Sequence, residues 1–157
     1  METKEMKAVV TRTINAPREL VFKAWVDPKH LAKWWGPRGF SAPVCEVDPK
    51  VGGAIRIHMD HPQFPDHWLK GEFVEIKEPE KLVFKSGAYV GKESFNALQG
   101  LNTITFEALP GGKTKLTVVA ILTKLEPGFE AALAGMETGW IQSIDKLEEM
   151  LEEVVSI

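Results

Sequence analysis

Histidines and carboxylates gather in one short stretch and are the first candidates for chemistry. Five of them fall within ten positions: His58, Asp60, His61, Asp66 and His67. Imidazole nitrogens and carboxylate oxygens are ligands for zinc and other transition metals. However, no established ligand spacing such as His-Glu-x-x-His occurs, and two prolines interrupt the stretch. The sequence therefore favours a polar hairpin loop over a metal site, and we expect neither a metal nor another cofactor.

The sequence offers no convincing motif for a catalytic nucleophile or for phosphate binding. Cys45 is the only cysteine, which excludes an internal disulfide. Its acidic neighbours Glu46 and Asp48 would raise the pKa of the thiol rather than activate it. Gly52-Gly53 precedes a predicted strand instead of a helix, which is the wrong context for a dinucleotide-binding loop, and no Gly-x-Ser-x-Gly motif occurs. We expect no catalytic residue.

Aromatic and other large apolar side chains offer a different function, because ligand pockets are lined mainly by such residues. The chain has five tryptophans, three of them at positions 25, 34 and 35. Core packing is one interpretation of these side chains. The alternative is an apolar ligand cavity lined by Trp35, Phe40, Ile57, Met59, Phe84, Phe106, Val118, Met136 and Trp140.

Arg56 and His58 are possible polar anchors near that cavity. They alternate with Ile55, Ile57 and Met59, however. Because successive residues of a strand point to opposite faces, the two polar side chains are predicted on the face away from the cavity.

The elements that would position these residues start with a strand at residues 5–14 and two short helices. Asn15 can cap the first helix, with Pro17 in its first turn. Asp27 followed by Pro28 repeats the start signal for the second helix. Gly36-Pro37 ends it, because proline cannot continue the hydrogen-bond ladder.

Residues 39–124 carry the pattern of an antiparallel sheet. Turn-forming clusters such as Pro110-Gly111-Gly112 separate runs rich in β-formers, and the last two runs alternate between apolar and polar residues. Together with the first strand, these runs predict a sheet of six or seven strands: residues 40–48, 54–60, 68–77, 81–88, 101–109 and 113–124.

A long amphipathic helix is predicted from Pro127 to Val154. Its apolar residues recur at steps of three and four, including Met136, Trp140, Ile144 and Leu147. Only this helix is long enough to cover the apolar face of the sheet. Gly135 and Gly139 lie about one turn apart on this helix and have no side chain. Each destabilises the helix by about 1 kcal/mol relative to alanine. They allow either close packing on the sheet or the floor of a cavity.

The composition excludes several partners. The chain has 157 residues and a net charge of −3, so a broad nucleic-acid or membrane-surface footprint is not expected. The longest apolar run, Val118 to Leu122, is far too short to span a membrane. The N-terminus is charged from its second residue and lacks the apolar core of a signal peptide, so we expect a cytoplasmic protein.

A set of motifs along nearly the whole chain resembles one family. Asn15-Ala16-Pro17, Val21 to Trp25, Asp27-Pro28 and Trp34 to Pro37 are similar to its opening. Asp48 with Gly52-Gly53, Gly71 to Phe73 and Leu82 to Phe84 resemble its middle, and Gly139-Trp140 with Leu147 its end. The chain resembles the activator-of-heat-shock-ATPase-homologue-like family of the START-like superfamily, which also holds the birch-pollen allergens and polyketide cyclases.

The resemblance implies an α+β helix-grip fold, in which a curved antiparallel sheet wraps a long C-terminal helix; we expect one such domain over residues 1–157. The superfamily hosts many functions, so fold alone decides none of them. Our leading hypothesis is a domain that binds a small apolar molecule without catalysis. Two alternatives stay open: a co-chaperone or stress-response module that binds a chaperone or another protein, and a cyclase- or hydrolase-like enzyme.

Overall fold

The seven strands in the described part of the chain belong to one antiparallel sheet. The computed structural model describes residues 7–36, 38–63, 67–90, 95–125 and 136–155. The strands follow the spatial order β1-β7-β6-β5-β4-β3-β2. Their bounds are β1 Lys7–Ile14, β2 Ser41–Val47, β3 Ala54–Asp60, β4 His67–Lys77, β5 Lys81–Val90, β6 Phe95–Leu109 and β7 Lys113–Leu125. Neighbouring strands in the sheet are consecutive in the sequence, with one exception. The exception is β1, which pairs antiparallel with β7.

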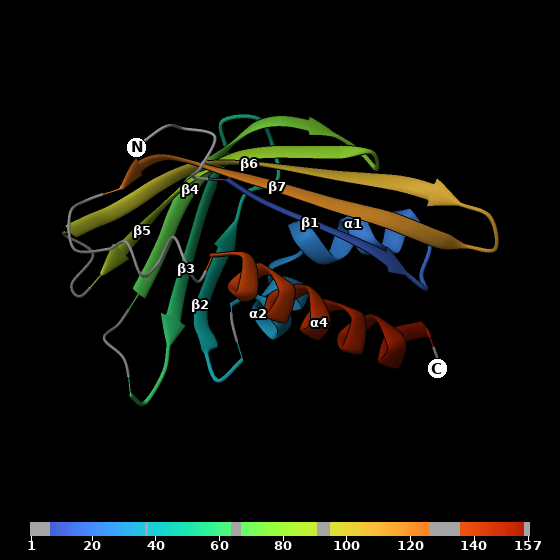
Figure 1. Cartoon of the computed structure of the whole chain (residues 1–157), viewed down its shortest axis with the longest axis horizontal. Helices are drawn as coiled ribbons and strands as arrows, with labels where there is room; N and C mark the ends of the chain where they lie inside the picture. The colour runs from blue at the N-terminus through green and yellow to red at the C-terminus, as the bar shows by residue number, and fades with distance from the viewer. Residues whose placement is uncertain (1–6, 37, 64–66, 91–94, 126–135, 156–157) are drawn as a thin grey trace.

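Within the described residues, three helices lie on the concave side of this sheet: α1 Arg18–Val26, α2 Pro28–Trp34 and α4 Met136–Val155. Figure 1 shows the sheet arching over α4, with α1 beneath β1 and β7 and α2 beside α4. This arrangement confirms the predicted helix-grip fold. The predicted start of the last helix at Pro127, and Gly135 within it, lie outside the described residues. No helix in the described part of the chain is long and apolar enough to cross a membrane.

The starts of the two short helices differ in their capping. The Asp27 side chain accepts a hydrogen bond of 2.9 Å from the backbone N–H of Lys29, which confirms the predicted cap of α2. The predicted cap of α1 at Asn15 is wrong. The flanking residue of α1 is Pro17, in extended conformation and without a side-chain cap, so the helix begins later than the Asn-Ala-Pro pattern indicated.

Strong curvature of the sheet depends on small residues where strands approach closely. Gly71 on β4 pairs with Ser86 on β5, which pairs with Gly100 on β6. A Cβ atom on Gly71 would overlap the backbone carbonyl oxygen of Lys85. Irregularities in register follow nearby, between Phe73 and Glu75 and between Gln99 and Gly100. Such irregularities increase local twist and bending, which lets the sheet wrap the helix.

One side of α4 is buried against the rest of the molecule. Ile144 and Leu147 are fully buried, and Met150 and Leu151 nearly so. A polar contact adds to this packing: the Arg12 guanidinium on β1 donates hydrogen bonds to Asp145, at 2.7 Å, and to Glu148. The C-terminal half of α4 is therefore held against β1, whereas the first turns of α4 face another part of the sheet.

Candidate functional site

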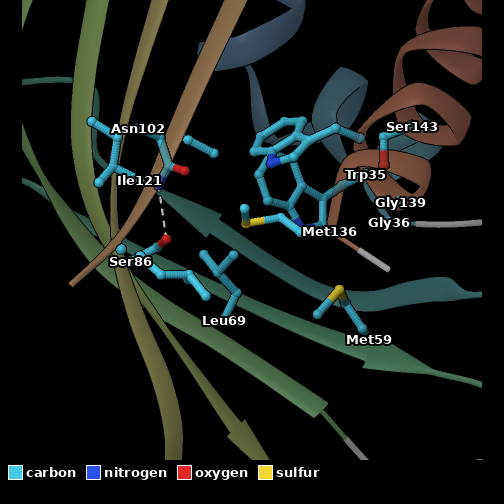
Figure 2. Close-up of a pocket in the computed structure, with 14 residues that line it drawn as sticks. Trp35, Gly36, Met59, Leu69, Ser86, Asn102, Ile121, Met136, Gly139 and Ser143 are labelled. Carbon is cyan, nitrogen blue, oxygen red and sulfur yellow. Dashed lines mark hydrogen bonds between the residues drawn. The ribbon is translucent and has the colours of Figure 1, made fainter. Parts of the chain in front are cut away.

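A cavity of about 250 Å³ lies where the first turns of α4 face the sheet. Figure 2 shows its walls, with the strands on one side and α4 with the segment after α2 on the other. Apolar side chains dominate the walls. The lining residues are Trp35, Gly36, Met59, Leu69, Ser86, Gly100, Asn102, Ala120, Ile121, Leu122, Met136, Gly139, Trp140 and Ser143.

Stacked tryptophans form the wall nearest the helices. The Trp140 ring on α4 stacks on Trp25 of α1 with centroids 6.0 Å apart, and it meets Trp35 edge-on at 5.4 Å. Trp25 in turn contacts Trp34, whose indole N–H donates a 3.0 Å hydrogen bond to the carbonyl of Ala24. Because three helical segments contribute to this cluster, it gives the cavity a rigid side.

Polar groups enter the cavity from the sheet. Asn102 on β6 is only 5% exposed, and its Nδ2 donates a 2.8 Å hydrogen bond to Ser86 Oγ on β5. The same Nδ2 also donates to the carbonyl of Phe84 at 3.3 Å. The lining also includes Ser143, which lies on α4 at the opposite wall of the cavity (Figure 2).

The segment between α2 and β2 is held against α4 by several polar contacts. Lys146 Nζ donates a 3.0 Å hydrogen bond to the carbonyl of Gly36. The Arg38 side chain pairs with Glu149, and the Arg38 backbone N–H donates to Gln142 at 3.1 Å. Burial lowers the pKa of Lys146, and the nearby positive charge of Arg38 lowers it further. These contacts fix the position of Trp35 in the cavity wall.

The nine predicted lining residues divide into three groups. Trp35, Met59, Met136 and Trp140 line the cavity. Ile57 and Phe84 surround a void of only about 10 Å³ deeper in the core, a wall that Trp35 shares. The other three lie apart: Phe106 and Val118 are buried in the core, and Phe40 packs 4.9 Å from the His61 ring beside the shallow outer surface formed by Arg38 and Lys146.

Sequence reasoning missed the polar members of the site, Ser86, Asn102 and Ser143. A usable signal existed for Asn102. Gly100, Asn102, Ile104 and Phe106 occupy alternate positions of one strand, so Asn102 had to share the inward face with Ile104 and Phe106. A polar residue on the apolar face of a strand calls for a partner or a function.

The histidine-rich stretch packs on aromatic rings. The His58 ring stacks on Trp68 at 4.6 Å, with the Arg56 guanidinium 4.1 Å from the same ring. The Arg56 and His58 side chains lie on the face of β3 away from Ile55 and Ile57, as the alternation predicted. Asp66 lies outside the described residues, and among those described no three histidine, cysteine or carboxylate side chains are placed to hold a metal ion.

Cys45 is half-buried on β2. Burial, with a smaller contribution from the charge of Glu46, raises the pKa of its thiol to about 11. The thiol is therefore protonated near neutral pH, and the arrangement provides no activated nucleophile there.

Comparison with known protein families decides the relationship. Residues 15–152 match the family described as Activator of Hsp90 ATPase homolog 1-like protein. The chain belongs to this family. Membership in the Activator of Hsp90 ATPase homolog 1-like family confirms the resemblance drawn from the Asn15-Ala16-Pro17 opening and the later motifs. Among curated proteins, no sequence matches this chain.

Solved structures share the fold over nearly the full chain. A protein from Nitrosomonas europaea superposes with a TM-score of 0.81 at 24% identity, covering 98% of each chain. One from Arthrobacter aurescens gives 0.83 at 24% identity, covering 98% of this chain and 90% of its own. A third, from Chromobacterium violaceum, gives 0.75 at 27% identity over 93% and 96%. These likenesses show that the chain shares its fold with these proteins.

Proposed function

We propose that this chain is a START-like domain of residues 1–157 that binds a small lipophilic molecule, without catalysis, in the cytoplasm. The observation that carries the proposal is the cavity between the sheet and the first turns of α4. Its mainly apolar walls with a few polar groups are typical of a ligand pocket.

The dimensions of the cavity suit a small ligand. Engineered apolar cavities of about 150 Å³ in other proteins stay dry and take up benzene. A space of about 250 Å³ is larger, and it accommodates a molecule of one or two rings. Apolar walls of Trp35, Met59 and Leu122 would bury the surface of such a ligand, which is the main source of affinity in pockets of this kind.

The chemistry of the walls supports binding rather than reaction. The described lining residues are apolar, glycine, serine or asparagine, and none has a side chain that titrates near neutral pH. General acid–base catalysis needs a group that gains or loses a proton near the working pH. The cysteine with a raised pKa lies on β2, outside this wall.

A native mass spectrum of freshly purified protein, followed by titration with prodan, an uncharged fluorescent probe with one naphthalene ring system, tests the proposal. We expect either a co-purified small molecule or saturable binding of one probe per chain, with a blue-shifted emission from the apolar surroundings. A ligand-free protein that shows no saturable probe binding would contradict the proposal.

A second candidate function is favoured by the description of the family, which refers to activation of the Hsp90 ATPase. On that basis the chain would act as a co-chaperone that binds a chaperone ATPase. Adding the protein to an Hsp90-type ATPase separates the two candidates. Cavity binding alone predicts an unchanged rate of ATP hydrolysis, whereas a saturable increase in that rate would favour the co-chaperone.

A further inference from the structure

The most informative group in the cavity is the hydrogen-bonded pair Asn102 and Ser86, which we call the polar pair. Both side chains come from central strands and point to the concave face, and Asn102 is almost fully buried. A buried amide on an otherwise apolar wall carries a cost unless each of its polar atoms finds a partner. The hydrogen bonds that Asn102 and Ser86 already make show which of their polar atoms are left to bind a ligand.

The orientation of the Asn102 amide follows from its neighbours. The backbone carbonyl of Phe84 can only accept a hydrogen bond, so the atom that faces it at 3.3 Å must be the donor Nδ2. The same nitrogen donates to Ser86 Oγ at 2.8 Å. Both hydrogens of the amide nitrogen are then used, and the amide oxygen lies on the cavity side of the residue (Figure 2).

Two complementary groups of the polar pair face the cavity. Asn102 Oδ1 is an acceptor, and Ser86, whose oxygen already accepts from Asn102, has a hydroxyl hydrogen left to donate. An alcohol or phenol satisfies both at once, because its oxygen accepts from Ser86 and its hydrogen is donated to Asn102.

Space in front of the polar pair comes from small residues in register. Ser86 lies between Gly71 and Gly100 on the neighbouring strands, and Asn102 pairs with Ala120 on β7. The other register partner of Asn102, Phe84 on β5, is large, but its side chain lines the small inner void and not the cavity. The sheet is therefore hollowed where its polar groups are, which is what a ligand group needs to reach them.

Charge selects further among ligands. None of the described residues that line the cavity is ionisable. Moving a carboxylate or phosphate into apolar surroundings without a cation is strongly unfavourable. Given the proposed cavity function, we infer that the ligand is an uncharged one- or two-ring molecule with a single hydroxyl group, which binds to Asn102 and Ser86.

Three probes with the same ring system test this inference by isothermal titration calorimetry: naphthalene, 2-naphthol and 2-naphthoate. Two added hydrogen bonds should make 2-naphthol bind about 10-fold more tightly than naphthalene. The uncompensated charge of 2-naphthoate should make it bind at least about 10-fold more weakly than 2-naphthol.

Substitutions test whether the difference in affinity between 2-naphthol and naphthalene arises at Ser86 and Asn102. Ser86→Ala should weaken 2-naphthol binding about 5-fold through the loss of one hydrogen bond and leave naphthalene unchanged. Thr103→Val is the matched control, since it removes a hydroxyl from β6 on the face away from the cavity, and it should leave both affinities unchanged. Asn102→Leu removes the acceptor and should abolish the preference for 2-naphthol; a melting curve establishes that each variant is folded.

The outcomes separate this inference from the proposed function. If naphthalene and 2-naphthol bind equally to the unaltered protein, if 2-naphthoate binds most tightly, or if Ser86→Ala weakens 2-naphthol binding no more than Thr103→Val does, the cavity proposal stands and the inference is overturned. If neither uncharged probe binds, the cavity proposal fails and the inference fails with it.

Discussion

Lys146 on α4 donates a 3.0 Å hydrogen bond to the backbone carbonyl of Gly36, the residue that follows Trp35 in the cavity wall. The helix thus holds both sides of the cavity: directly through Met136, Gly139 and Trp140, and indirectly through the segment that Lys146 fixes. The charge is held in a partly buried position, where burial lowers the pKa of Lys146.

Lys146→Met keeps the apolar stem and removes the hydrogen bond, so the segment after α2 should open more often. A hydrogen bond from a charged donor contributes about 1.5 kcal/mol, so amide hydrogen exchange at Gly36 and Arg38 should accelerate roughly 10-fold. Lys23→Met, at an exposed lysine of α1, is the control and should leave exchange there unchanged. Equal exchange in both variants would show that Lys146 does not hold this segment.

Gly71→Ala tests whether close strand approach creates the curvature of the sheet. The new methyl group would overlap the backbone carbonyl of Lys85, which cannot move without shifting β5. We expect a loss of at least about 3 kcal/mol in unfolding free energy, the upper end for overpacking.

Gly52→Ala is the matched control for this change. Gly52 has a positive φ of 82° but nothing within 4 Å of an added Cβ, so only backbone strain of about 1 kcal/mol applies. Both values come from urea denaturation. Equal losses in the two variants would mean that the approach of Lys85 to Gly71 is not a steric limit.

The reactivity of Cys45 should follow a raised thiol pKa. Because only the thiolate reacts, a pKa of about 11 in place of 9.0 lowers the alkylation rate by iodoacetamide at pH 8 about 100-fold relative to a free thiol. The rate should keep rising with pH up to about 11. A rate that levels off near pH 9 would contradict the buried setting.

The same shift has a defined sign for stability. Above the usual thiol pKa of 9.0 the unfolded chain loses the Cys45 proton while the folded chain keeps it. Ionisation therefore favours the unfolded state, and this contribution of Cys45 to stability falls as pH rises from 9.0 to about 11. Cys45→Ser should show less loss of stability over that interval in urea denaturation.

Local patterns predicted most of the architecture. Two-residue alternation and turn clusters gave strands close to the observed ones, and Asp27-Pro28 correctly placed the start of α2. The β6 strand was predicted from Leu101 but begins at Phe95. Its first residues include Asn96, Gln99 and Gly100, which have weak strand propensity, so pairing with β5 and β7 rather than local preference makes them part of the sheet.

The cavity was harder to predict than the fold. Periodicity identified which residues face inward, and it therefore placed Met59 and Trp140 on the correct side. It could not separate Phe106, which packs against Trp25 at 6.2 Å, from residues with open space before them. That distinction depends on the neighbours of each strand position: Ser86 lies between Gly71 and Gly100, whereas Phe106 pairs with Leu116 and contacts the rings of Phe22 and Trp25. Such packing is a tertiary property that strand spacing does not contain.

Gly139→Leu tests the central claim, that the space between α4 and the sheet is a ligand pocket. Gly139 lines the cavity, so a leucine side chain there should occupy it and weaken prodan binding at least about 10-fold, with stability retained because leucine favours the helix over glycine. Thr138→Leu, on the exposed side of the same turn, should bind the probe as the unaltered protein does. If Gly139→Leu instead binds the probe normally and is destabilised by about 1–3 kcal/mol through overpacking, the space is not a binding site.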